Sequence, residues 1–85
     1  MKIKVLFFAN FKEILDCSSI EIDIDDQSTV LALCDTLADK GPRWQSIFQN
    51  ASKTVKIAVN QEMTDTAHQL SVNDEVAFFP PVTGG

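Results

Sequence analysis

The sequence predicts a single α+β domain, a roll in which a mixed sheet of four or five strands packs one main helix on one face. Residues 2–9 begin with alternating charged and apolar side chains and become wholly apolar, and residues 75–79 are apolar on both faces after Glu75; both patterns are typical of strands at the centre of a sheet. Residues 19–25 alternate between isoleucine and polar side chains, which indicates a half-buried strand. Apolar residues between 30 and 37 recur at helical spacing, and 85 residues suffice for only one core.

The first two strands are expected to form an antiparallel hairpin. Residues 11–15 can make one helical turn between them. In the first strand Leu6 and Phe8 point away from the other apolar side chains, which are Ile3, Val5 and Phe7. The spacing also allows exposed charge pairs across the hairpin, formed by Lys2, Lys4, Glu21 and Asp23.

The main helix follows the hairpin. Asp26-Gln-Ser-Thr29 supplies candidate N-cap side chains, and Gly41-Pro42 ends the helical pattern. Its apolar side consists of Val30, Leu33, Cys34 and Leu37. Pro42 can begin a second short helix, whose apolar side consists of Trp44, Ile47 and Phe48.

Two further strands complete the sheet. Residues 53–60 alternate again and predict a third strand. Residues 61–73 are polar and rich in turn formers, so they predict a loop anchored by Leu70 and Val72. The last strand is residues 75–79.

The two doubly apolar strands, first and last in the chain, fit side by side at the centre of the sheet. They then run parallel and are joined by a long crossover, as connection rules allow. This arrangement is the β-grasp of ubiquitin-like proteins. We therefore expect a β-grasp domain over residues 1–79 and an extended tail over residues 80–85.

One helix layer covers only one face of the sheet, so the opposite face is informative. The predicted core is Ile3, Val5, Phe7, Ile20, Ile22, Ile24, Ile57, Val59, Val76 and Phe78. The period places on the opposite face Leu6, Phe8, Ala58, Ala77 and Phe79, with Met63 at the rim. Such an apolar patch predicts a protein interface. The alternative is that the second helix or the 61–73 loop folds over it.

Charge and composition exclude several function classes. Twelve acidic against seven basic residues give a net charge of −5, so a nucleic-acid or anionic membrane surface is not expected. No apolar run approaches the roughly 20 residues of a membrane span. With two cysteines and one histidine, no metal site is expected, and we expect a cytoplasmic protein with reduced thiols.

The C-terminal residues suggest reactive chemistry. Pro80 and Pro81 end the strand and set the exit direction of the tail, which at four further residues can reach about 13 Å. Gly84 has no Cβ and leaves the terminal carboxyl group of Gly85 accessible. A carboxylate is a poor electrophile, so a partner that uses ATP would have to activate it. The alternative is an inert, frayed end.

Four segments resemble the molybdopterin and thiamine sulfur-carrier family, in particular the small subunits of molybdopterin synthase. The segments are Lys4-Val-Leu-Phe-Phe-Ala9, Arg43-Trp44, Ala58-Val-Asn-Gln61 and Asp74-Glu-Val-Ala-Phe-Phe-Pro-Pro-Val-Thr-Gly-Gly85.

The resemblance implies a chemical role for the tail. A ubiquitin-activating-like adenylyltransferase would adenylate Gly85 with ATP, and conversion to a thiocarboxylate would follow. The tail, including Val82 and Thr83, would then enter the large subunit of molybdopterin synthase and donate sulfur to cyclic pyranopterin monophosphate. Two small subunits flank a dimer of large subunits in such complexes. The chain would be the non-catalytic subunit and would bind no cofactor itself, and the family's hydrophobic contact positions match Phe8, Met63 and Phe79.

Other interpretations stay open at this point. The chain could carry sulfur for another pathway, such as thiamine synthesis, or it could be a ubiquitin-like binding module with an inert tail. A persulfide on Cys17 is a rival way to carry sulfur, although no neighbouring cation is evident. Cys34 is expected in the core, and His68 is expected on the surface.

Overall fold

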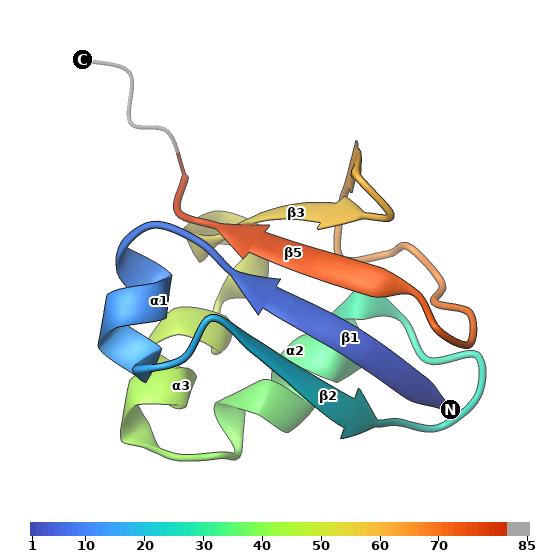
Figure 1. Cartoon of the computed structure of the whole chain (residues 1–85), viewed down its shortest axis with the longest axis horizontal. Coiled ribbons are helices and arrows are strands. Elements are labelled where there is room, and N and C mark those ends of the chain that lie inside the picture. The colour runs from blue at the N-terminus through green and yellow to red at the C-terminus, as the bar shows by residue number, and fades with distance from the viewer. Residues whose placement is uncertain (82–85) are drawn as a thin grey trace.

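A computed structural model of the chain describes residues 1–81. The elements in chain order are β1 (Lys2–Phe7), α1 (Asn10–Leu15), β2 (Ser19–Asp23), α2 (Val30–Ala38), α3 (Pro42–Phe48), α4 (Ala51–Thr54), β3 (Lys56–Val59), β4 (Glu62–Thr64) and β5 (Glu75–Phe79). The strands form one sheet in the order β2-β1-β5-β3-β4 (Figure 1). β1 and β5 pair in parallel, and all other neighbouring strands pair antiparallel. The predicted α+β fold with central first and last strands is confirmed.

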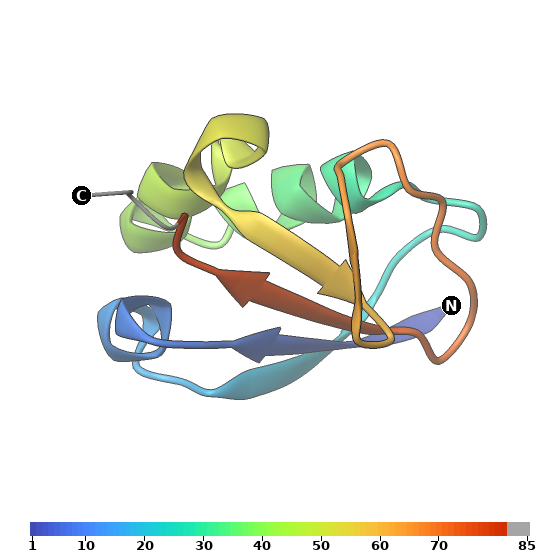
Figure 2. The same ribbon diagram turned by 90° about the horizontal axis from the view of Figure 1, so that it is seen from above.

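The molecule has two layers. Figure 2 shows α2, α3 and α4 on one side of the sheet, whereas α1 lies at the end of β1. None of the helices among residues 1–81 covers the opposite face. The predicted one-sided arrangement is therefore correct, although three short helices accompany the main one.

Aromatic side chains fill the core between the central strands and α3. Phe78 of β5 is fully buried; its ring lies 6.3 Å from that of Phe7 and meets the Phe48 ring edge-on at 4.9 Å. Trp44 contacts Phe7 edge-on at 5.4 Å. Burial of each large apolar side chain stabilises the fold by about 1.5–3 kcal/mol. These contacts also place α3 on the same face as α2, so α3 does not cover the open face.

The segment after β4 is fixed to the start of α2. The backbone N–H groups of Val30 and Leu31 donate to the carbonyl oxygens of His68 and Thr66, both at 2.9 Å. Leu70 is buried, and its N–H donates to the Ser28 carbonyl oxygen at 2.8 Å. Helix N–H groups that have no partner within the helix are thereby satisfied. This part of the predicted 61–73 loop therefore caps the helix instead of lying on the open sheet face.

Asp74 links the two turns that precede β4 and β5. Its carboxylate accepts hydrogen bonds from the Asn60 side-chain amide at 2.9 Å and from the Ser71 N–H at 2.8 Å. Asn60 and Gln61 both have positive φ, 51° and 72°, as the two-residue turn of a tight hairpin requires. The start of β5 is thus anchored to the β3–β4 hairpin.

Four expectations are corrected by the structure. Leu70 anchors the 61–73 segment as predicted, but Val72 does not, because it is 62% exposed. The third strand begins at Lys56, not at residue 53, because α4 occupies the preceding residues. β4 was not predicted; it forms because the Asn60-Gln61 turn brings a three-residue segment back along β3. Three predicted core residues of the β2 segment are only half-buried because β2 is an edge strand; they are Ile20, Ile22 and Ile24.

The cap of α2 provides a test of this description. The Thr29 hydroxyl accepts a hydrogen bond from the Ala32 N–H at 3.2 Å. We expect Thr29→Ala to lower the free energy of unfolding by about 1 kcal/mol in urea denaturation, because the N-cap acceptor is lost. Thr29→Ser retains the hydroxyl and should remain within about 0.5 kcal/mol of the original chain. An equal loss in both variants would contradict a capping role for the hydroxyl.

Candidate functional site

The open face of the sheet carries a row of apolar side chains across four strands. The pairing register aligns Leu6 with Ala77, Ala77 with Ala58, and Ala58 with Met63. We call these four residues the apolar row. Its two alanines are buried, Leu6 is half-buried and Met63 is 65% exposed. The apolar surface that this row offers to another protein is therefore provided mainly by Leu6 and Met63, on either side of two small buried side chains.

Two phenylalanines extend this surface at the end of the central strands. The rings of Phe8 and Phe79 stack with centroids 4.7 Å apart and planes inclined by 10°. We call them the aromatic pair. Phe8 is 40% exposed and Phe79 is half-buried. The Phe8 N–H donates to the Phe78 carbonyl oxygen at 3.2 Å, which extends the contact between the two chain segments beyond β1.

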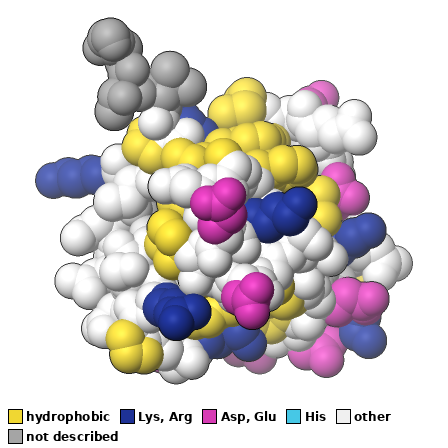
Figure 3. All heavy atoms as spheres, turned by 60° about the vertical axis from the view of Figure 1, so that its left-hand side comes forward, with side chains coloured by type: hydrophobic (Ala, Val, Ile, Leu, Met, Phe, Trp, Pro, Cys, Tyr) yellow, Lys and Arg dark blue, Asp and Glu magenta, His cyan; other side chains and the backbone are white. Residues whose placement is uncertain are grey.

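The open face changes from charged to apolar along the direction of β1. Near its start, Lys4 lies beside Glu21 of β2 and Glu75 of β5 in the register. Farther along come the apolar row and then the aromatic pair. Figure 3 shows a band of hydrophobic side chains on this side of the molecule, with charged side chains of both signs around it. The apolar end is the end at which β5 finishes.

The predicted interface residues are brought together by the fold. Leu6, Phe8 and Phe79 lie at one end of the open face, and Met63 lies at its β4 edge. The predicted tail residues Pro80 and Pro81 follow β5 directly, the first half-buried and the second exposed. The remaining predicted tail residues, Val82, Thr83, Gly84 and Gly85, lie outside the described residues.

The chain was compared with protein families and with known proteins. A model described as the ThiS family matches residues 5–85. The chain belongs to the ThiS family. It is 42% identical over 83 residues to the molybdopterin synthase sulfur carrier subunit of Escherichia coli (strain K12), covering 98% of this chain and 99% of the relative. It is 36% identical to the protein of the same name from Haemophilus influenzae, with the same coverage.

The solved structures agree with this family assignment. The crystal structure of SAMP1 from Haloferax volcanii superimposes with a TM-score of 0.83 at 26% identity, covering 100% of both chains. A curated protein of that organism, 28% identical, is named small archaeal modifier protein 1. The ThiS family match covers residues 5–85 and the structural likeness covers the whole chain, which confirms the resemblance expected from the sequence.

Neither thiol of this ThiS-family chain is suited to nucleophilic chemistry. Cys34 is fully buried in the core as predicted, and burial, with a smaller effect of Asp35, raises its pKa to about 12. Partial burial also raises the pKa of Cys17; the Asp16 carboxylate adds to the increase and Lys40 opposes it. Lys40 is a neighbouring cation that the sequence did not reveal, but it does not reverse the shift. Both thiols therefore remain protonated at neutral pH.

Other sites for chemistry are not apparent in the part of the chain that the structure describes. His68 is exposed, as expected. Within residues 1–81, no group of three histidine, cysteine or acidic side chains is arranged to hold a metal ion. No helix in this range is long and apolar enough to cross a membrane.

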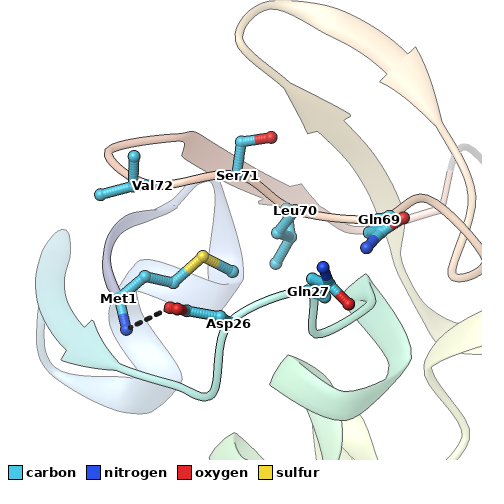
Figure 4. Close-up of a pocket in the computed structure, with 7 residues that line it drawn as sticks. All are labelled: Met1, Asp26, Gln27, Gln69, Leu70, Ser71 and Val72. Atoms are coloured by element: carbon cyan, nitrogen blue, oxygen red, sulfur yellow. Dashed lines mark ion pairs between the residues drawn. The ribbon is translucent and has the colours of Figure 1, made fainter.

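Two cavities differ in their relation to the candidate interface. The larger, about 500 Å³, lies at the start of β1, where the Met1 ammonium group is 3.4 Å from the Asp26 carboxylate (Figure 4). It is at the opposite end of β1 from the aromatic pair and does not belong to that surface. A cavity of about 350 Å³ adjoins Phe8 on the open face. Its lining consists of Lys4, Leu6, Phe7, Phe8, Ala9, Lys12, Ser18 and Ser19.

The thiol environments can be tested by alkylation. Treatment of the native chain with iodoacetamide at mildly alkaline pH should modify Cys17 slowly and leave Cys34 unmodified, because a raised pKa reduces the thiolate fraction and burial blocks access. In denaturant both cysteines should react at the rate of free cysteine. Peptide mass mapping measures both rates. Equal rates for Cys34 and Cys17 in the native chain would contradict the described core.

Proposed function

We propose that this chain carries sulfur as a thiocarboxylate on Gly85 and delivers it as the small subunit of a molybdopterin synthase. The supporting observation is the position of the aromatic pair, which lies next to the apolar row at the end of the sheet where Phe79 leads into Pro80 and Pro81. A docking surface beside a terminal segment allows one partner to bind the domain and receive the tail together. The names of the relatives support the same function.

The first step activates the terminal carboxylate. A Gly85 carboxylate oxygen attacks the α-phosphorus of ATP on an adenylyltransferase, pyrophosphate leaves, and an acyl-adenylate forms. A hydrosulfide ion, as the simplest sulfur donor, then attacks the acyl carbon and displaces AMP. The product is a thiocarboxylate and the released proton passes to solvent. ATP is thus used on the partner enzyme, and no cofactor is assigned to this chain.

The second step transfers the sulfur. In the large subunit, the thiocarboxylate sulfur attacks an electrophilic carbon of cyclic pyranopterin monophosphate and displaces an oxygen substituent of that carbon, which leaves with the bonding electron pair and takes up a proton. Water then cleaves the acyl–sulfur bond and regenerates the Gly85 carboxylate. Two such transfers supply the two sulfur atoms of the dithiolene. Reactive acyl groups must be kept from bulk water beforehand, which favours a narrow tail inserted into a closed pocket.

The tail residues have separate parts in this proposal. Gly84 and Gly85 lack a Cβ and permit close approach to the reacting carbon. Val82 and Thr83 contact the walls of the partner's pocket. Pro80 and Pro81 set the exit direction, because proline fixes φ and restricts the preceding residue to extended conformations. The domain surface that docks consists of Leu6, Phe8, Met63 and Phe79.

A second function is favoured by the likeness to SAMP1 of Haloferax volcanii and to the modifier protein of that organism. In that case a lysine amine of another protein attacks the acyl carbon of the same acyl-adenylate, AMP leaves, the nitrogen loses a proton and an amide forms. Both functions need a free carboxyl group on Gly85. They differ in product, since sulfur transfer regenerates the free chain and protein modification yields a conjugate of higher mass.

Extension of the chain by one alanine after Gly85 tests the proposal. After incubation with the adenylyltransferase, ATP and sulfide, we expect the original chain to gain the mass of one sulfur minus one oxygen atom. With the large subunit present, the extended chain should not convert cyclic pyranopterin monophosphate to molybdopterin, because its terminal carboxyl group is displaced by one residue. Intact-mass spectrometry and product analysis measure the two steps.

Cys17→Ser provides the matched control. It removes the more accessible thiol and should load sulfur as the original chain does. Undiminished molybdopterin formation by the extended chain, or loss of loading in Cys17→Ser, would contradict a carboxyl-bound sulfur.

A further inference from the structure

We propose that Phe8 is a positioning residue for the tail: by stacking on Phe79 it fixes the direction in which the chain continues beyond β5. This inference rests on the proposed function, in which the tail enters a partner. Phe8 would then act within its own chain, by orienting the segment after β5, in addition to any contact that it makes with the partner. Three features of the residues around the aromatic pair restrain Phe79 and the segment that follows it.

The first feature is the stack itself. Phe79 is the last residue of β5, and its ring lies nearly parallel to that of Phe8 at 4.7 Å. The ring of Phe79 is therefore restrained from the β1 side. On its other side Phe79 pairs with Lys56 of β3. The end of β5 is thus held between two neighbouring strands, and Phe8 supplies the aromatic contact.

The second feature is that Phe8 is itself held in place. Its carbonyl oxygen accepts a hydrogen bond from the Phe11 N–H at 3.2 Å, which closes a turn over Ala9. Ala9 has φ 55° and ψ −135°, a conformation that favours glycine and is strained for alanine. The strain is sustained because Phe11 and Leu15 of α1 are buried in the core. Phe8 therefore has a fixed position before any partner binds.

The third feature is the proline pair. Each proline has a fixed φ, and each residue before a proline is restricted to extended backbone conformations. Phe79 precedes Pro80, and Pro80 precedes Pro81. The direction of the backbone at Phe79 is thereby transmitted as far as the Cα atom of Pro81 with little freedom. Phe79 sets the direction of this segment, and it is the residue on which Phe8 stacks.

Positioning and direct contact differ in their dependence on the tail. A contact between Phe8 and the partner contributes the same binding free energy with or without residues 82–85. A positioning role contributes only when those residues are present, because the direction held at Phe79, Pro80 and Pro81 matters for binding only if a tail follows to be inserted. A double-mutant cycle measures this dependence directly.

The experiment measures the Kd of the large subunit of molybdopterin synthase for four chains by titration calorimetry. They are the original chain, Phe8→Ala, the chain ending at Pro81, and Phe8→Ala ending at Pro81. The ratio of Kd values without and with residues 82–85 gives the effect of the tail. We expect this ratio to fall about three- to tenfold in Phe8→Ala. A change of this size corresponds to the cost of ordering one or two additional residues when the tail binds.

Two further variants keep the result interpretable. Phe8→Leu retains an apolar contact but lacks the stacked ring, and its ratio should fall as well. Met63→Ala is the matched control: Met63 is an exposed apolar residue of the same face, 65% exposed, and lies in β4 away from the aromatic pair. It should weaken binding of the full and shortened chains equally. Because the Phe8 side chain is 40% exposed, its replacement should leave the domain folded. Urea denaturation of each variant verifies this.

The outcomes separate the inference from the function on which it rests. If Phe8→Ala weakens binding but leaves the ratio unchanged, Phe8 is a partner contact only and the positioning role is wrong. If the original chain does not bind the large subunit at all, the proposed function fails and the inference falls with it. A reduced ratio in both Phe8 variants, with an unchanged ratio in Met63→Ala, supports it.

Discussion

The parallel pairing of β1 with β5 is the constraint on which the rest of the structure depends. The register aligns Val5 with Val76 and Phe7 with Phe78, so the two most apolar segments of the chain share the centre of the sheet. Parallel strands finish at the same end of a sheet, and this brings Phe8 next to Phe79 although the two residues are far apart in sequence. The pairing therefore creates the core, the aromatic pair and the place where Pro80 begins.

The one-sided helix layer follows from the same arrangement. The helices cover the sheet face that contains Val5 and Phe78. Both side chains are fully buried there, and together with the helices they form the core of this small domain. The opposite face keeps small side chains at its centre, Ala58 and Ala77, and larger ones at its margins. A partner that binds this face would lie beside the end of β5. Fold and proposed chemistry are thus connected: in the proposed function the domain would supply a docking surface, and the terminal residues would supply the reacting group.

Sequence patterns predicted the central elements because each has a strong local signal. β5 is apolar on both faces, and α2 has helical spacing and the Thr29 cap. α4 has no such signal; its end is held by the Thr54 hydroxyl, which donates to the Ile47 carbonyl oxygen at 2.6 Å, a contact that depends on α3. β4 is too short for a period and forms through pairing with β3. The interface residues followed from alternation, whereas the stacking of Phe8 depends on the turn at Ala9, which only the folded chain reveals.

The most direct measurement of the central claim is localisation of the transferred sulfur. The chain would be loaded with a heavy sulfur isotope in the presence of the adenylyltransferase and ATP, and fragmented in a mass spectrometer without prior reduction. If Gly85 carries the sulfur, the isotope will be found only in fragments that contain Gly85. Isotope in a fragment bearing Cys17 or Cys34, with the terminal residue unlabelled, would contradict it.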